Sequence, residues 1–520
     1  MIWQIIRKEL LVNLLSLRFL IGLVVVVSMM GPVGYVLVED YAARQQTYLS
    51  DVQRHKTQLE QTKVYSKIEV VVDIPPSPLS VFSRGVKDRP TSITVSPYLI
   101  LSLIGEAGVR ASIDLGGTST RPYNPLLLVF SSIDLAFVIS IILSLFAILL
   151  VFDSLSGERE QGTLRLILTC PVKRGDLLLG KFLGALLTIL VPLTLGFLEL
   201  MLLWSLSPHI SLDASSWVGV GLVYFASLIF LSGFLALGLF VSLFAKEASS
   251  GFMYLLLVWI VVAIVIPEGG GYLADYFRPQ DSREKAIRET EQPMDEFYKV
   301  YRSLRYQQKT PWYNANMNPV GAESIMGLTK EEVQDRTEFN KNVFPLKFRL
   351  AEQRDRIFES YAVPLKGWSR IRDGITRASL CVSYRNIAQA IAATDLGSYE
   401  IALGRARIYR DALMTYLQPK VGTPEWVTRA LEYPDVQPTD QNRGYWQELI
   451  GREGERSVEK ILSWDRVAPL DLGTMPQPQI EFATLAERLE QMIVDMLLLA
   501  GGTALFLALS GWQIQRYRVH

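Results

Sequence analysis

Residues 175–181 have the spacing of a nucleotide-binding loop and are the first candidates for chemistry. The run Gly175-Asp-Leu-Leu-Leu-Gly180-Lys181 places two glycines and a lysine where they could surround phosphate groups. Phe182 then stands where such a loop needs a Ser or Thr hydroxyl to hold magnesium. The segment also leads directly into a long apolar run and follows no buried strand. We therefore predict that residues 175–181 bind no nucleotide.

Residues that bind metals or act as nucleophiles are few and scattered. Cys170 and Cys381 allow at most one disulfide, which excludes a multi-cysteine zinc site. The histidines lie far apart in the chain, at His55, His209 and His520. A G-x-S-x-G nucleophile turn is absent from the sequence. The sequence thus predicts no catalytic residue, no metal site and no cofactor on this chain.

The balance of charge argues against a nucleic-acid partner. Lys and Arg together number 52, and Asp and Glu together number 52. There is therefore no overall positive field to attract a phosphate backbone. Basic and aromatic residues interleave in 297–302, but their helical spacing favours an ordinary packed and solvated helix face.

Hydrophobic residues make up 49% of the chain and gather in six long segments. Each segment is close to or above the roughly 20 residues that a helix needs to cross a bilayer. The predicted transmembrane helices are 19–38, 126–152, 182–206, 216–245, 248–267 and 491–515. The expected fold class is mainly α, a polytopic membrane protein of the bacterial inner or cytoplasmic cell membrane.

Basic residues in the short connections orient these helices. Lys and Arg gather in 1–18, in the connection 153–181 and in the tail 516–520, whereas the connection 207–213 has none. The positive-inside rule assigns the basic segments to the cytoplasm. Both termini are therefore predicted to be cytoplasmic, and 1–18 is expected to lie on the membrane surface as an amphipathic helix.

Two long segments, 39–124 and 268–490, are then extracytoplasmic, and both are predicted to fold. In the first, 39–63 reads as a helix that continues the first membrane helix outward, and 67–73 reads as a strand. The second is expected to be mostly helical, at 281–306, 331–361, 371–394, 399–417 and 443–463, with 480–491 running into the last membrane helix.

Segment 157–168 has the composition of a contact site for another protein. Gly157-Glu-Arg-Glu-Gln-Gly-Thr163 is a charged cluster between glycines, and an apolar helical turn follows it. Such a segment is suited to lie at the membrane surface and insert into a groove on a partner. On spacing alone, a solvated loop whose charges only fix the topology explains it equally well.

The same residues resemble the cytoplasmic coupling segment of type-2 ABC exporter permeases. Gly157–Thr163 carries the resemblance, together with Pro171 and with Gly180-Lys181 at the start of the next helix. The six spans also match that family's plan. The chain is similar to the branch with permeases of gliding motility and of copper-enzyme maturation in nitrous oxide reduction. It departs from the plan in the long segment 268–490, which leaves the substrate open.

The resemblance implies a transport subunit that is not itself an enzyme. ATP and magnesium would bind a separate cytoplasmic ABC ATPase, and a second permease, identical or different, would complete a dimer surrounded by membrane lipid. The extracytoplasmic domain would dock cargo or an extracytoplasmic partner. The residues expected to couple to the ATPase are Glu158, Arg159, Glu160, Gly162 and Thr163.

Three acidic residues, Asp134, Glu199 and Asp495, fall in the outer half of the predicted spans. Because an intramembrane carboxylate commonly faces a bundle interior or a wet cavity, they are candidates for a translocation path. The alternative is that each is hydrated near the membrane surface.

Two functions besides export stay open at this stage. The chain could transmit force or act as a receptor, using ATP hydrolysis to move its outer domain without transporting cargo. A membrane-anchored hydrolase is disfavoured, because the sequence contains neither a metal-ligand cluster nor a nucleophile turn.

Overall fold

The structure is a computed structural model of the chain. It describes residues 2–62, 68, 70–85, 90–95, 109–113, 134–169, 173–207, 213–276, 282–307, 370–421, 470–478 and 483–516, with short stretches inside 338–360. Among the predictions, residues 126–133 of the second span, the helix 443–463, the tail 517–520 and Cys170 lie outside the described residues.

Six helical segments are long and apolar enough to span a membrane. The unbroken ones are α2 (Leu17–Glu60), α8 (Arg174–Leu206), α9 (Ala214–Phe244) and α19 (Leu485–Arg516). The second span joins α4 (Leu135–Val138), the π-helical turn η3 (Ile139–Leu143) and α5 (Ser144–Val151). The fifth joins α10 (Ala248–Ile260), the π-helical turn η4 (Val261–Val265) and α11 (Ile266–Tyr276). The chain is therefore a mainly α, polytopic membrane protein, as predicted.

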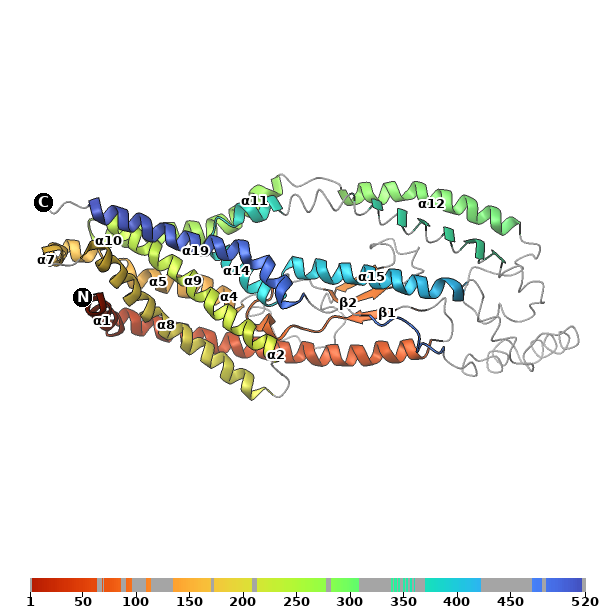
Figure 1. Ribbon diagram of the computed structural model, residues 1–520, viewed down its shortest axis with the longest axis horizontal. Helices are drawn as coiled ribbons and strands as arrows, with labels where there is room; N and C mark the ends of the chain where they lie inside the picture. Colours follow the sequence, from red (N-terminus) through yellow and green to blue (C-terminus); the bar gives the residue numbers. More distant parts are fainter. Residues whose placement is uncertain are drawn as a thin grey trace, which may run out of the picture.

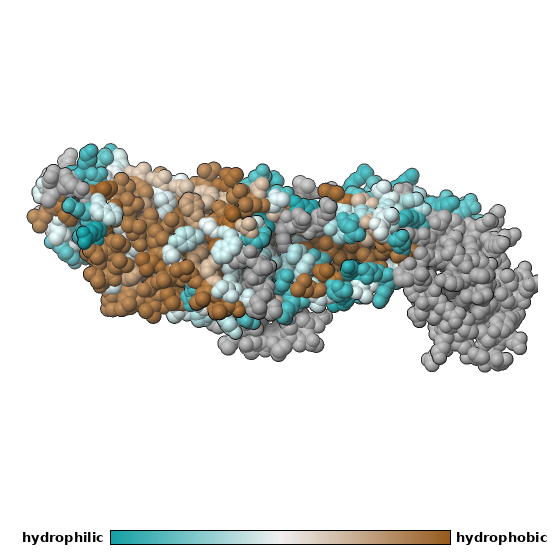
Figure 2. Space-filling model, turned by 60° about the horizontal axis from the view of Figure 1, so that its bottom comes forward, coloured by the Kyte–Doolittle hydropathy of each residue, from teal (hydrophilic) through white to brown (hydrophobic). Residues whose placement is uncertain are grey.

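The bundle has two distinct ends. Helix α1 (Ile2–Leu14) and the C-terminal end of α19 lie together at one of them, which we call the terminal end (Figure 1). Helix α2 runs on past the opposite, distal end, as predicted for 39–63, and accommodates Pro32 without a break. Figure 2 shows an apolar surface over the bundle and a more polar one beyond it. An apolar surface of that extent suits contact with lipid.

Beyond the distal end, the chain forms a mixed α and β distal domain. The strands β1 (Val70–Asp73), β2 (Pro90–Val95) and β3 (Val109–Ile113) form an antiparallel sheet in that order. Helix α15 (Leu396–Val421) packs on this sheet through a small apolar core that includes Ile93, Val95, Ala406 and Leu413. Strand β1 confirms residues 70–73 of the predicted strand 67–73, and the predicted helix 399–417 is confirmed within α15.

A second helical unit completes the described part of the distal domain. Helix α12 (Ser282–Tyr306) matches the predicted helix 281–306, and helical stretches within 338–360 lie beside it (Figure 1). Phe297 and Tyr301 of α12 pack against Phe339 and Val343. The aromatic residues that could have mimicked a nucleic-acid surface therefore contribute to a helix pair.

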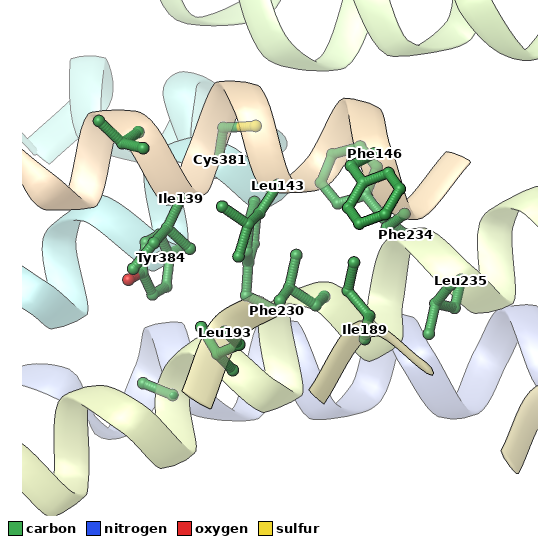
Figure 3. Close-up of a cluster of buried hydrophobic side chains, with 14 of the residues drawn as sticks. Ile139, Leu143, Phe146, Ile189, Leu193, Phe230, Phe234, Leu235, Cys381 and Tyr384 are labelled. Atoms are coloured by element: carbon green, nitrogen blue, oxygen red, sulfur yellow. The ribbon is translucent and has the colours of Figure 1, made fainter. Parts of the chain in front are cut away.

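The structure corrects the prediction of one continuous helix over 371–394. Residues 370–376 are helical, a turn follows at 377–379, and helix α14 (Leu380–Ile391) begins afresh with Ser379 as its N-cap. Helix α14 also packs inside the bundle, mainly against α19 and α9. Figure 3 shows Cys381 and Tyr384 among the buried side chains of the membrane helices. We call residues 370–391 the re-entrant hairpin.

The residues that follow the hairpin pack closely on Gly85. Gly85 has φ +61, and a β-carbon there would lie 1.9 Å from the carbonyl oxygen of Thr394. Only glycine adopts this left-handed conformation without cost and also leaves room for the neighbouring backbone.

We predict that Gly85→Ala lowers the free energy of unfolding by about 1–3 kcal/mol, because it adds backbone strain and a clash with a carbonyl group. Gly175→Ala is the matched control, since nothing lies within 4 Å of a β-carbon there. It should leave stability unchanged or raise it. Thermal unfolding midpoints of the two purified variants test this, and equal midpoints would contradict it.

Candidate functional site

The charged segment singled out in the sequence forms two short helices at the terminal end of the bundle. Helix α6 (Ser156–Glu160) and helix α7 (Thr163–Thr169) are joined by a tight turn. Gly162 makes that turn with φ +73, a left-handed conformation that glycine adopts readily. The hydroxyl of Thr163 donates to the carbonyl oxygen of Glu158 at 3.2 Å and closes the turn. We call 153–169 the coupling segment.

The coupling segment is fastened to the end of α9. The Ser242 hydroxyl oxygen accepts hydrogen bonds from the backbone N–H groups of residues 155–156, at 3.1 and 3.0 Å. The Arg159 guanidinium donates to the carbonyl oxygens of Ala245 and Leu243, at 2.8 and 2.9 Å. These carbonyls end α9 and lack partners within the helix, so a cation satisfies both their bonding and the helix dipole.

Two further contacts reach other membrane helices. The Glu160 carboxylate accepts from the backbone N–H of Ala248, at the start of α10, at 3.0 Å. Asp153 forms an ion pair with Arg18 of α2 at 2.5 Å. The Arg18 guanidinium also lies over the Phe152 ring, 4.7 Å from its centroid. The coupling segment thus contacts the first, fourth and fifth spans through named polar groups.

The deepest contact is a buried ammonium group. Lys181 Nζ of α8 lies 3.0 Å from Glu9 Oε1 of α1 and 2.8 Å from Glu158 Oε1 of the coupling segment, and its side chain is 1% exposed. Lys8 Nζ pairs with the same two carboxylates, at 3.0 and 3.1 Å. Helix α1 comes this close because Gly180 faces it, where a β-carbon would meet Ile5 at 2.7 Å.

The charges of this cluster balance, which allows Lys181 and the two glutamates to be largely buried beside the half-exposed Lys8. Two lysines face two glutamates, so no net charge is left uncompensated. Burial of Glu9 works to raise its pKa, but the ammonium groups of Lys181 and Lys8 outweigh it and hold the pKa below its ordinary value. Glu9 therefore stays ionised and keeps α1 attached to α8.

Residues 175–181, whose spacing resembles that of a phosphate loop, are helical. The two glycines and the lysine belong to α8, and the lysine is already paired with carboxylates of this chain. Sequence reasoning missed Glu9 and Lys181 as site residues. A lysine at the start of an apolar helix, with no acidic neighbour in sequence, is the signal that could have identified Lys181.

The predicted coupling residues are thus together at one site, and several side chains point inward. Glu158 and Arg159 are partly buried and engaged within the chain. The surface that the coupling segment presents to the outside includes Gln161, Gly162 and Leu166, and Leu166 is 69% exposed. Direct contact of the predicted residues with an ATPase stays a prediction.

The three carboxylates assigned to a translocation path have different surroundings. Asp134 is the N-cap of α4 and accepts from the Phe137 N–H at 2.7 Å, besides the Ser83 hydroxyl and the Arg84 N–H. Glu199 of α8 packs against Gly31 of α2.

Asp495 of α19, the third of these carboxylates, is 1% exposed and pairs with Arg377 of the re-entrant hairpin at 3.1 Å. That partner was not identified from sequence. A role in translocation stays a prediction for all three carboxylates. No group of three or more His, Cys, Asp or Glu side chains within the described residues is placed to hold a metal ion.

Comparison with known proteins identifies the family. Residues 3–327, more than half of the chain, match the family model described as ABC-2 family transporter protein. The chain belongs to this family. The prediction of a type-2 ABC permease is confirmed, and the family match together with the six candidate spans supports a membrane permease subunit of an ABC transporter.

Two curated members of the family are similar over shorter stretches. The chain is 34% identical to a probable ABC transporter permease protein NosY of Pseudomonas aeruginosa over 148 residues, which cover 26% of this chain and 53% of that protein. It is 35% identical to the protein of the same name of Stutzerimonas stutzeri over 117 residues, 22% of this chain and 39% of that protein. The matches thus span about half or less of these relatives.

We predict that Lys181→Met destabilises this ABC-2 permease by up to about 3–5 kcal/mol, because it removes the buried cation shared by Glu9 and Glu158 and leaves them only the half-exposed Lys8. Lys173→Met removes an exposed lysine beside the start of the same helix and should change stability by less than about 0.5 kcal/mol. Lys181→Arg keeps the charge and should recover part of the loss. Chemical or thermal unfolding of the purified variants measures this, and equal stability of the two methionine variants would contradict it.

Proposed function

We propose that this permease couples ATP hydrolysis on a separate ABC ATPase chain to movement of its membrane helices, for export across the cell membrane. The observation that carries the proposal is that the coupling segment is joined by polar contacts to α1, α2, α8, α9 and α10. A force that the ATPase applies to so short a segment would displace the helices that it contacts. It would be passed to several spans at once as a rigid-body tilt.

In this proposal the ATPase binds the exposed side of the coupling segment. Leu166 supplies an apolar anchor of the kind that inserts into a partner's groove. Gly162 and Thr163 shape the turn that presents it, and Glu160 lies beside it. Glu158 and Arg159 would act mainly by fixing the segment to the bundle, so their substitution should uncouple the ATPase even where they do not touch it.

The remaining parts of the assembly follow from the family plan. ATP and magnesium would bind the partner ATPase, and a second permease would form the other half of a dimer, with cargo passing between the two. Both termini would be cytoplasmic, which puts the coupling segment on the side where ATP is available. The distal domain would then be extracytoplasmic and available to an extracytoplasmic partner.

A second function, movement of the distal domain without transport of cargo, is favoured by one observation. Helix α2 runs unbroken for 44 residues from the terminal end into the distal domain, so a tilt of the first span would be delivered beyond the membrane. Transport by the reconstituted complex in proteoliposomes separates the two functions. ATP-dependent cargo uptake or release supports export, and ATP hydrolysis that moves the distal domain without cargo supports force transmission.

We predict that Leu166→Asp weakens binding of the ATPase roughly tenfold or more, since loss of a buried leucine contact costs about 1.5–3 kcal/mol. Lys246→Asp places the same acidic group in the exposed turn between α9 and α10 and serves as the control. Titration of purified ATPase onto each variant in nanodiscs gives the affinities. Unchanged binding of the Leu166 variant would remove the proposed contact.

Topology can be tested independently of the ATPase. In a background with both native cysteines replaced, cysteines introduced at Ser211 or Arg302 should react with an impermeant thiol reagent applied to intact cells. Cysteines at Glu160 or Lys246 should react only after the cells are opened. Reaction of the Lys246 variant in intact cells would reverse the orientation and place the ATPase contact elsewhere.

A further inference from the structure

The re-entrant hairpin enters the bundle from the distal end and leaves by the same end. Its first arm brings Thr376 beside Gly270 of α11, and the turn brings the Ser379 hydroxyl to the Val262 carbonyl oxygen, at 2.5 Å. Since α11 lies on the distal side of Val262, this arm runs inward. Helix α14 then runs outward along α9, with Leu380 beside Gly233 and Ile391 beside Gly219.

The buried face of α14 makes specific aromatic and polar contacts with the membrane helices. The Tyr384 ring stacks on Phe230 of α9, 4.6 Å between centroids, and its hydroxyl lies 2.8 Å from that of Ser227. The Cys381 thiol points to the carbonyl oxygen of Ser140, in the second span. Such buried, hydrogen-bonded aromatic contacts define one seating, because a shifted helix would leave hydroxyl groups unpaired.

An ion pair joins the turn of the hairpin to the last span. Arg377 Nε donates to Asp495 Oδ1 at 3.1 Å, and the Asn386 amide lies 3.5 Å from the same oxygen. The Asp495 side chain is 1% exposed, whereas that of Arg377 is 32% exposed. A carboxylate buried to that degree requires its cation, so movement of the hairpin away from α19 would carry a large electrostatic cost.

The C-terminal end of the hairpin leads into the distal domain through a short connection. Only residues 392–395 separate α14 from α15, the helix that packs on the distal sheet. This short connection is itself well defined, since Ala393 adopts φ +51 and Thr394 packs on Gly85. Helix α15 is therefore attached directly to an element buried in the membrane bundle.

We propose that the re-entrant hairpin is a joint that fixes α15 and the distal sheet to α9 and α19, beside the Arg405–Glu487 ion pair and the extension of α2, and that the Arg377–Asp495 ion pair keeps this joint in place. The distal domain then follows these two spans as one body. Its use during ATP-driven movement rests on the proposed function above, whereas the joint itself is a property of the permease alone.

Native Cys381 reports whether the hairpin is seated, because it is 1% exposed in the seated position. With Cys170 replaced by serine, the purified permease in nanodiscs is treated with a maleimide. Arg377→Gln and Asp495→Asn should each raise the rate of Cys381 labelling about tenfold or more, because each leaves the opposite charge uncompensated.

The matched control for this experiment is Arg370→Gln, which removes an exposed arginine from the same hairpin and should leave labelling unchanged. The double variant Arg377→Asp, Asp495→Arg restores opposite charges and should return most of the protection. Slow labelling of Cys381 in both single variants would overturn the role of the ion pair. Fast labelling in the double variant as well would show that charge pairing is not what seats the hairpin.

A second experiment tests the joint. Spin labels are placed at Ile408 of α15 and Trp217 of α9, both of which are exposed. The distance distribution between them should be narrow in the otherwise native chain. A short glycine linker inserted between Ala393 and Thr394 should broaden it, and an equally narrow distribution in the linker variant would overturn the proposal.

The results of these experiments distinguish failure of the joint from failure of the proposed function. If the native permease bound no ATPase, the coupling proposal would fail while the labelling and distance results stood. If ATPase binding were intact and the linker variant kept a narrow distribution, the coupling proposal would stand and the joint would fail.

Discussion

A buried ammonium group imposes the arrangement of the terminal end. Lys181 is in a long apolar helix and is 2% exposed, so it needs anionic partners, and the residues near it in sequence supply none of those it uses. The partners are Glu9 and Glu158, which come from α1 and from the coupling segment. One electrostatic requirement therefore brings three segments together and fixes α1 and the coupling segment against α8, the third span.

The same requirement recurs inside the bundle, at the turn of the re-entrant hairpin, with the charges reversed. There the buried group is a carboxylate, Asp495, and its cation Arg377 comes from the re-entrant hairpin. Each of these ion pairs fastens an element that is not itself a membrane span to the membrane helices. Apolar packing within a lipid-exposed bundle is not directional, whereas a buried ion pair has one good geometry, so such pairs specify where the attached elements are seated.

Sequence reasoning succeeded where one local pattern decides the outcome. The six apolar runs, the helix that continues the first span and the strand 67–73 needed only length and periodicity. It failed where the decisive partner is remote. Glu158 reads as a surface charge because its partners Lys181 and Glu9 are remote in sequence. Helix α14 reads as a soluble amphipathic helix because Arg385 and Asn386 lie on the face opposite its buried residues.

In the proposed function, the contacts of the coupling segment and of the re-entrant hairpin define a path along which a movement of the coupling segment would reach the distal domain. A push on the coupling segment is passed by Lys181 to α8 and by Arg159 to the end of α9. Helix α9 carries it to the hairpin, whose seating on α9 and α19 passes it to α15. Helix α2 offers a parallel route through its own length. Every step of this route is a helix or a polar contact within the chain, which is the basis for our proposal that the distal domain moves with the bundle.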